Sequence, residues 1–233
     1  MNKNIKDFWN RKFIKSKEVG KFGLSTLAQK ISIEHEYNMF KENVLDNVKE
    51  ASVLEIGCGI GIISDFLVNE TSIEKLLCTD ISKEGISECI SKGIPASIAN
   101  AENLKFHNKS FDIICGFALL HHLDNPQKAV KEACRVSRRF VYFHEPNRWN
   151  PIRHLTERFV YSKEEHETSY YPKQYKEWFK DTGFSVRIIS YDFMIPYISN
   201  KFITMMNFYL GRLLEVTPIK RIGASLAIIA ERK

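Results

Sequence analysis

A glycine-rich turn directly after an apolar run is the feature that most constrains the fold of this chain. The run Val53-Leu54-Glu55-Ile56 leads into Gly57-Cys58-Gly59-Ile60-Gly61. Glycine adopts a positive φ at little cost and, because it lacks a Cβ, lets a ligand approach main-chain N–H groups. The pattern predicts a strand over residues 52–56, a turn that can hold a nucleotide-sized ligand, and a helix over residues 61–69.

The spacing of the three glycines separates this turn from two common nucleotide-binding loops. A dinucleotide fingerprint reads GxGxxG, but here Gly61 comes one residue early and Ile62 stands where the third glycine would be. A P-loop needs Gly-Lys-Ser/Thr, which does not follow this turn. The turn keeps an acidic residue, Glu55, inside the end of its strand.

Strands and helices alternate along the next ninety residues. The pattern predicts strands at 75–79, 95–99, 111–116 and 138–144, helices at 83–92 and 126–135, and a preceding helix at 31–48. This alternation is typical of a doubly wound α/β sheet, whose ligands bind at the carboxyl ends of the strands. Asp80 ends the second strand, 23 residues after Gly57, where a carboxylate can hydrogen-bond ribose hydroxyls. Alternatively, it caps the next helix beside Ser82.

These motifs resemble those of the class I S-adenosylmethionine (SAM) dependent methyltransferases, in particular their small-molecule (type 11) branch. The likeness extends over Asn100-Ala101-Glu102-Asn103-Leu104-Lys105-Phe106, over Phe111 to Gly116, and over Leu120-His121-His122-Leu123. The resemblance implies a Rossmann-like seven-stranded sheet of order 3-2-1-4-5-7-6 with an antiparallel last strand. It also implies SAM as the cofactor and S-adenosylhomocysteine as the product.

The resemblance further implies where SAM is held. Glu55 would lie near the methionine end, Asp80 at the ribose, and the loop after residue 99 beside the adenine. The implied cofactor-binding residues are Glu55, Gly57, Cys58, Gly59, Gly61, Asp80, Ile81, Asn100, Ala101, Glu102 and Phe117. The family usually has Asp where Asn100 stands and Pro where Lys105 stands, so this loop departs from the pattern. No metal is expected, because the methyl group of SAM already sits on an activated sulfonium.

The composition is that of one globular domain. The 233 residues are 44% hydrophobic and contain five scattered cysteines without a CxxC pair, and no secretory h-region or ~20-residue apolar span occurs. We therefore expect a cytoplasmic protein with one methyltransferase domain over residues 1–233. Within it, residues 1–50 would form an N-terminal cap, 51–145 the SAM-binding core, and 146–233 the acceptor side and the rest of the sheet.

An insert of about thirty residues, 193–223, separates the expected sixth strand, 184–192, from the last strand, 224–231, whereas a hairpin needs roughly 2 to 5. Apolar residues recur there at helical spacing: Ile198, Phe202, Met205, Met206, Tyr209 and Leu213. We predict a helix whose apolar face borders the acceptor pocket, with Phe8, Trp9 and Phe22 closing the pocket from the other side. The stripe could instead pack on the sheet or touch a membrane or a partner protein.

A general base is needed only if the acceptor loses a proton. His122, past the fourth strand, and His144, at the end of the fifth, are the candidates, although a histidine in such a place is often a packing residue. A metal site built from these histidines with His121, Asp124 and Glu145 is disfavoured, because adjacent histidines are expected to point apart and no HExxH spacing occurs.

The leading hypothesis is a SAM-dependent methyltransferase acting on an O, N or C atom of a small hydrophobic or lipid-like acceptor. The alternative is a tRNA or other RNA methyltransferase, which the net charge of +6 and the eight basic residues among residues 1–30 favour. No aromatic-flanked basic stripe supports it, so no stable nucleic-acid partner is expected. A non-catalytic SAM-binding partner subunit is the second alternative, and a peripheral membrane contact stays open.

Overall fold

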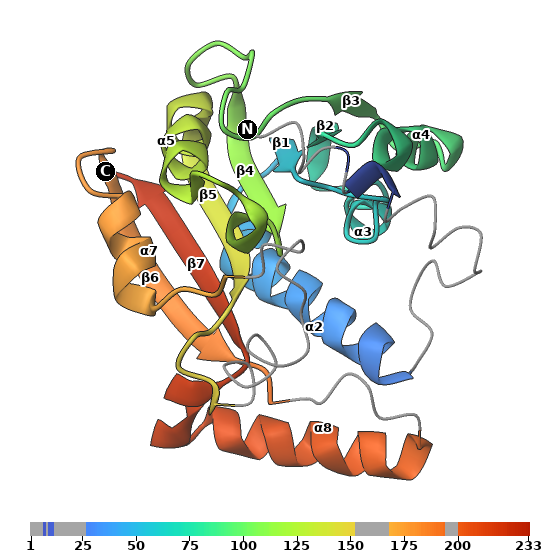
Figure 1. Cartoon of the computed structure of the whole chain (residues 1–233), viewed down its shortest axis with the longest axis vertical. Coiled ribbons are helices and arrows are strands. Elements are labelled where there is room, and N and C mark those ends of the chain that lie inside the picture. Colours follow the sequence, from blue (N-terminus) through green and yellow to red (C-terminus); the bar gives the residue numbers. More distant parts are fainter. Residues whose placement is uncertain (1–6, 8, 12–26, 152–167, 194–199) are drawn as a thin grey trace.

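Seven strands form one sheet in the order β3-β2-β1-β4-β5-β7-β6 (Figure 1). The computed structural model describes residues 7, 9–11, 27–151, 168–193 and 200–233. The strands are β1 (Ala51–Ile56), β2 (Ile73–Asp80), β3 (Ala96–Ile98), β4 (Phe111–Phe117), β5 (Ser137–Pro146), β6 (Phe184–Tyr191) and β7 (Ser225–Arg232). The pairs from β3 to β5 are parallel, whereas β7 runs antiparallel to both β5 and β6. The predicted fold class and strand order are confirmed.

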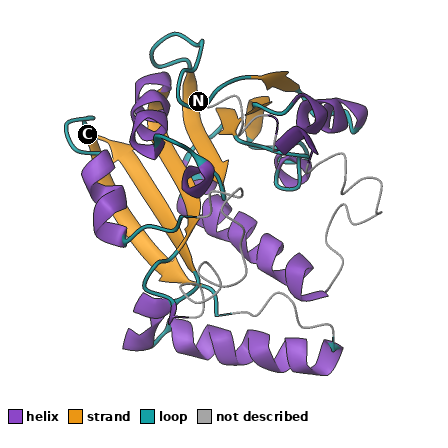
Figure 2. Cartoon of the chain, in the orientation of Figure 1, coloured by secondary structure: helices purple, strands orange, loops and turns teal. Residues whose placement is uncertain are grey.

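Helices cover both faces of this sheet (Figure 2). The α-helices are α2 (Leu27–Asn43), α3 (Ser64–Leu67), α4 (Lys83–Ser91), α5 (Pro126–Val136), α7 (Pro172–Trp178) and α8 (Lys201–Glu215), and short 3₁₀ helices span Leu45–Asn47, Leu120–His122 and Pro218–Ile222. The helix predicted over residues 61–69 is shorter than expected. Gly61 has a φ of +80°, which no right-handed helix accommodates, so α3 begins only at Ser64.

Alternation along the strands divides the core into two layers. Leu54 and Ile114 face a layer that α5 and α7 complete, whereas Val53 and Ile113 face a layer that α2 and α3 complete. Successive strand residues point to opposite faces, so every residue of β1 is buried. A strand that is apolar on both faces belongs in the centre of a parallel sheet, and its carboxyl end therefore opens into the middle of the molecule.

The predicted insert helix is present as α8, between β6 and β7. Asn200 caps it, because its side-chain oxygen accepts a hydrogen bond from the Ile203 N–H at 3.1 Å. Helix α8 lies beside the N-terminal half of α2 at one end of the molecule (Figure 1). It covers neither face of the sheet.

Candidate active site

A cavity of about 310 Å³ opens at the carboxyl ends of β1, β2 and β4. Its wall combines the turn after β1, the end of β2, the loop after β3, the turn after β4, and one face of α2. The lining residues are Trp9, Ile33, Glu36, Glu55, Gly57, Cys58, Gly59, Ile60, Ile62, Ile63, Asp80, Ile81, Ala99, Ala101, Phe117, Ala118, Leu119, His122 and Leu123. Most of this wall is apolar, with carboxylates at three separated points, as in a site that orients one polar ligand.

The glycine turn is tied to β2 by its own main chain. The N–H groups of Gly57 and Cys58 donate to the Thr79 carbonyl at 2.7 and 3.0 Å. Gly57 has a φ of +74°, and a Cβ there would lie 2.5 Å from Leu119 Cδ1. Gly61 does not line the cavity. A Cβ on Gly61 would lie only 2.8 Å from Ile94 Cδ1, so glycine leaves room for that side chain. The turn therefore needs glycine both for its backbone conformation and for close packing.

Asp80 joins the glycine turn to the start of α4. Its Oδ2 accepts a hydrogen bond from the Gly59 N–H at 2.9 Å, and its Oδ1 accepts one from the Ser82 N–H at 2.7 Å. The cap of α4 is Ser82, whose hydroxyl oxygen accepts from the Gly85 N–H at 3.1 Å. The alternative role of Asp80 as the helix cap is therefore taken by Ser82. A carboxylate has about four acceptor positions, and the main chain at Gly59, Ser82 and Ile81 hydrogen-bonds Asp80, so about one position is left for a ligand in the cavity.

Glu55 is a buried carboxyl at the floor of the same cavity. Its Oε2 accepts hydrogen bonds from the Ser64 hydroxyl at 2.5 Å and from the Cys78 thiol at 3.4 Å. Burial raises the pKa of Glu55 to about 7, and the charge of Asp80 adds to the increase, although the hydrogen bonds from Ser64 and Cys78 oppose it. The charge of Glu55 therefore responds to the charge of whatever fills the cavity.

The loop after β3 places only part of its predicted set at the cavity. Ala101 lines it. The side chain of Asn100 instead accepts from the Glu102 N–H at 2.9 Å, and Glu102 Oε1 accepts from the Asn125 N–H at 3.1 Å. These two side chains thus shape the loop, since Asn and Asp commonly bond their own backbone two residues on.

The two adjacent histidines lie against each other, contrary to the expectation that they point apart. Their ring centroids are 3.9 Å apart, because both belong to the 3₁₀ helix Leu120–His122. Glu145 anchors that helix: it accepts from the Leu120 N–H at 2.7 Å and lies 2.8 Å from His121 Nδ1. His122 lines the cavity, edge-on to Trp9 at 4.8 Å between centroids. Among the described residues, no group of three or more His, Cys, Asp and Glu side chains could hold a metal ion.

Three polar side chains, Tyr191, His144 and Glu36, form a hydrogen-bonded row that reaches the cavity at α2. His144 Nε2 lies 3.2 Å from Glu36 Oε1, and His144 Nδ1 hydrogen-bonds the Tyr191 hydroxyl. Burial, aided by the charges of His121 and His35, lowers the pKa of His144 to about 3. Burial, aided by the charge of Asp192, raises the pKa of Glu36 to about 8.

Of these three side chains, only Glu36 touches the cavity. Glu36 lines it, whereas His144, predicted as a base, lies behind Glu36 and is not part of the wall. The signal in the sequence was a glutamate among the apolar positions of the first helix, between Ile33 and Phe40 at spacings of three and four. These spacings put the three residues on one helical face.

Helix α8 does not line the described cavity, so the prediction that its apolar face borders the pocket is wrong for the described residues. Trp9 does line the cavity, as predicted. Ile198, Phe8 and Phe22, the other residues named for this enclosure, lie outside the described residues.

Comparison with known proteins finds methyltransferases. A family model described as "Methyltransferase domain" matches residues 54–143. A possible histamine N-methyltransferase from Thermotoga maritima superposes with a TM-score of 0.69 at 17% identity, covering 98% of this chain and all of that one. Magnesium protoporphyrin IX methyltransferase from Synechocystis, solved with bound S-adenosylhomocysteine, gives 0.66 at 12% identity and covers 98% of each chain.

A curated relative, malonyl-[acyl-carrier protein] O-methyltransferase from Neorickettsia risticii, is 29% identical over 101 residues, which are 42% of this chain and 40% of that enzyme. The chain matches about two fifths of the length of its curated relatives. The strand order, the glycine turn and the family match together define a class I methyltransferase fold. Residues 54–143 are thus similar to a methyltransferase domain, and the sheet as a whole has the fold of the solved methyltransferases.

Proposed function

We propose that this chain transfers the methyl group of SAM to a small acceptor of hydrophobic character, bound at the end of the cavity that α2 forms. The observation that carries this proposal is the continuity of one cavity from Asp80 and Ala101 to Ile33, Glu36 and Trp9. A methyl transfer needs the cofactor and the acceptor in one enclosed space with their reacting atoms in line. The apolar wall at the α2 end favours an acceptor that is largely apolar.

The cofactor would lie with its ribose beside Asp80 and its adenine beside Ala101. Its methionine part would then lie over Gly57 and Gly59, with the sulfonium toward Glu55. A carboxylate stabilises a nearby cation most where water is excluded, and Glu55 is only 2% exposed. The sulfonium supplies the activated methyl group, so the remaining task of the chain is to position the acceptor and accept its proton.

Glu36 is the group we propose for that proton. His144 is neutral, and its Nε2–H can donate to Glu36 Oε1 while its Nδ1 accepts from the Tyr191 hydroxyl. This arrangement holds one carboxylate oxygen and leaves the other for the cavity. A pKa of about 8 is near the operating pH, where a general base is most effective. His144, with its lowered pKa, is thus a positioning residue, and His122 stays an alternative base on the cavity wall.

The experiment supplies methyl-labelled SAM with three separate acceptor pools: a lipid extract, a small-molecule fraction and total RNA. We expect label in the lipid extract or in apolar members of the small-molecule fraction. Label in RNA alone would transfer the assignment to the RNA methyltransferases. SAM binding by calorimetry without transfer to any pool would instead support a non-catalytic partner subunit.

Glu36→Gln tests the base once an acceptor is found, with Glu42→Gln, an exposed position on the same helix, as the matched control. We expect kcat to fall by about 10²- to 10⁴-fold in Glu36→Gln, with S-adenosylhomocysteine affinity within a few-fold of the native value. An acceptor without a dissociable proton, or full kcat in Glu36→Gln, would remove the base from the mechanism.

A further inference from the structure

Helix α8 carries an apolar face that nothing in the described part of the chain covers. The α8 apolar face consists of Phe202, Ile203, Met206, Tyr209, Leu210, Leu213 and Val216, which are 50–84% exposed. At 100° per residue these positions form one continuous arc, and none of them is charged. Soluble proteins rarely expose contiguous apolar patches of this kind unless something binds there.

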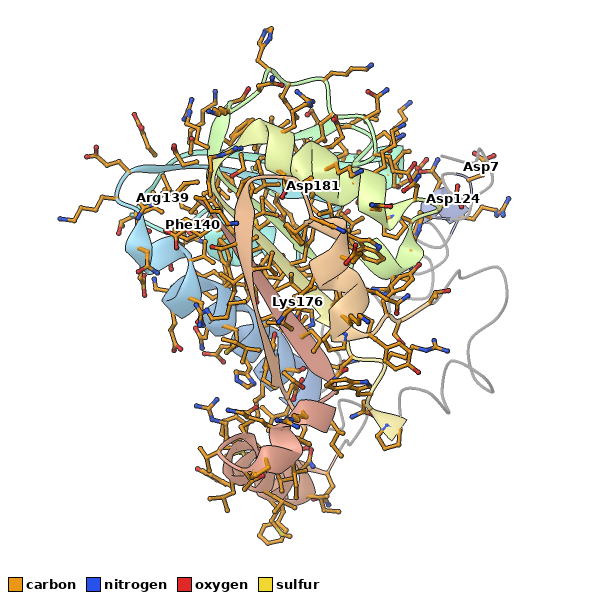
Figure 3. The ribbon with its side chains drawn as sticks, turned by 90° about the vertical axis from the view of Figure 1, so that its left-hand side faces the viewer. Asp7, Asp124, Arg139, Phe140, Lys176 and Asp181 are labelled. Atoms are coloured by element: carbon orange, nitrogen blue, oxygen red, sulfur yellow. The ribbon has the colours of Figure 1, made fainter. Side chains whose placement is uncertain are left out.

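The opposite side of α8 explains why this face points outward. Thr204 and Gly211 are the buried residues of the helix, and a Cβ on Gly211 would lie only 3.4 Å from Phe193 Cβ. Glu215 Oε1 accepts a hydrogen bond from the Asp192 N–H at 2.9 Å. Thr204, Gly211 and Glu215 therefore lie on the side of the helix that meets the protein, and the α8 apolar face lies on the other side, with the helix at the bottom of the view in Figure 3.

The charges around the face are nearly all positive. Residues 200–222 contain Lys201, Arg212, Lys220 and Arg221, all exposed, and one acidic residue, Glu215. Glu215 is only 15% exposed and pairs with Arg212 at 3.1 Å. Lys201 and Arg212 are three helical turns apart and so border the apolar arc on the same side. The 3₁₀ helix Pro218–Ile222 adds exposed Ile219 and Ile222 next to its two cations.

We propose that the α8 apolar face docks on an anionic lipid surface. A helix with an apolar face and cationic borders lies in the interface plane of a membrane, with its cations at the headgroups. A second copy of the chain is a poorer occupant, because a two-fold interface would bring two such cationic borders together. None of the described helices is long and apolar enough to cross a bilayer, and α8, at 15 residues, is about 22 Å long, shorter than the ~30 Å hydrocarbon core.

The docked face would lie one helix away from the cavity. His35 of α2 lies 3.0 Å from Arg212 Nη1 of α8, and Ile33 and Glu36 of α2 line the cavity. A lipid surface held on α8 would therefore lie beside the α2 end of the cavity. The docking itself depends only on the α8 surface, so it goes beyond the proposed methyl transfer and can be tested without it.

Vesicle flotation of the full chain, without cofactor, tests the proposal. The probes are phosphatidylcholine vesicles and vesicles with about one-third phosphatidylserine. We expect flotation with the anionic vesicles, and release as salt is raised. The triple variant Phe202→Ser, Met206→Ser, Leu213→Ser should reduce the bound fraction at least about tenfold. Ile90→Ser on α4, at a position 59% exposed, should leave it unchanged.

Charge reversal provides the second variant. Lys220→Glu with Arg221→Glu should abolish flotation with anionic vesicles, whereas Lys176→Glu with Lys180→Glu on the α7 side should not. Failure of the native chain to float, or flotation of the triple variant like the native chain, would overturn the proposal. Size-exclusion that shows a dimer dissociated by the triple variant, with no flotation, would assign the face to a second copy instead.

Discussion

The affinity of this chain for SAM should increase with pH, because Glu55 faces the cationic part of the proposed ligand. Burial raises the pKa of the unliganded Glu55 to about 7, so at pH 6 about nine tenths of the molecules carry a neutral Glu55. A bound sulfonium favours the ionised carboxylate and lowers that pKa again. Binding at pH 6 then includes the loss of a proton, which costs about 1.4 kcal/mol more than at pH 8. The dissociation constant should therefore be about tenfold higher at pH 6 than at pH 8.

Calorimetry measures both the dissociation constant of SAM and the number of protons released on binding. Titrations of SAM in two buffers of different ionisation enthalpy should show about half a proton released at pH 7 and almost none above pH 8. Glu55→Gln should lose the pH dependence, and Glu177→Gln, at an exposed position of α7, should retain it. Glu36→Gln measures any contribution of Glu36, the other carboxyl with a raised pKa in the cavity wall, to the pH dependence of SAM affinity. An affinity that is flat between about pH 6 and 8 in the native chain, or a tenfold change that survives in Glu55→Gln, would refute this reasoning.

Three further predictions follow from the same contacts. Glu36 and Glu55 have pKa values above those of the unfolded chain. Their contribution to stability is therefore complete below about pH 4.5 and is lost as the pH rises through about 7 to 8. Thermal unfolding of the unliganded protein should accordingly show a lower Tm at pH 8 than at pH 5. Asp80→Asn should weaken SAM binding by about ten- to a hundred-fold in calorimetry, and an effect below twofold would limit Asp80 to bracing the turn. Gly61→Ala should lower the free energy of unfolding in urea by about 2–4 kcal/mol, because the positive φ and the contact with Ile94 both oppose a Cβ. Gly93→Ala, at φ +78° with open space around it, should lower it by only about 1–2 kcal/mol. Equal losses would show that the packing around Gly61 is unimportant.

The sheet could be predicted from the sequence because its signals are local. Each strand of the parallel half is an apolar run that ends in a turn. The boundaries predicted for every strand of the sheet lie within about two residues of those observed. The predicted start of the helix at residue 61 was wrong. The composition of residues 61–69 is helical overall, but Gly61 has a φ of +80°, so it cannot be part of the first helical turn. The cavity residues of the glycine turn and Asp80 could also be placed, since both follow strand ends.

Glu36 could not be assigned to the site in the same way. Its position on the apolar face of α2 is visible in the sequence, but which part of that face meets the cavity depends on how α2 crosses β4, β5 and β7. His144 had the opposite outcome: its place at the end of β5 is correct, yet its ring faces α2 behind Glu36. Periodicity tells which side of an element is buried, not which neighbour buries it.

The outward direction of the α8 apolar face follows from the elements that α8 packs against. Helices α5 and α7 pack on one face and α2 and α3 on the other, whereas α8 packs beside α2 and the 3₁₀ helix Pro218–Ile222. The residues of α8 that are buried there are the small Thr204 and Gly211. An exposed apolar stripe is kept only at a cost in solubility. Helix α2 connects α8 to the cavity, because His35 contacts α8 and Glu36 lies in the cavity wall. Docking at the stripe and chemistry at the cavity would then share one rigid element.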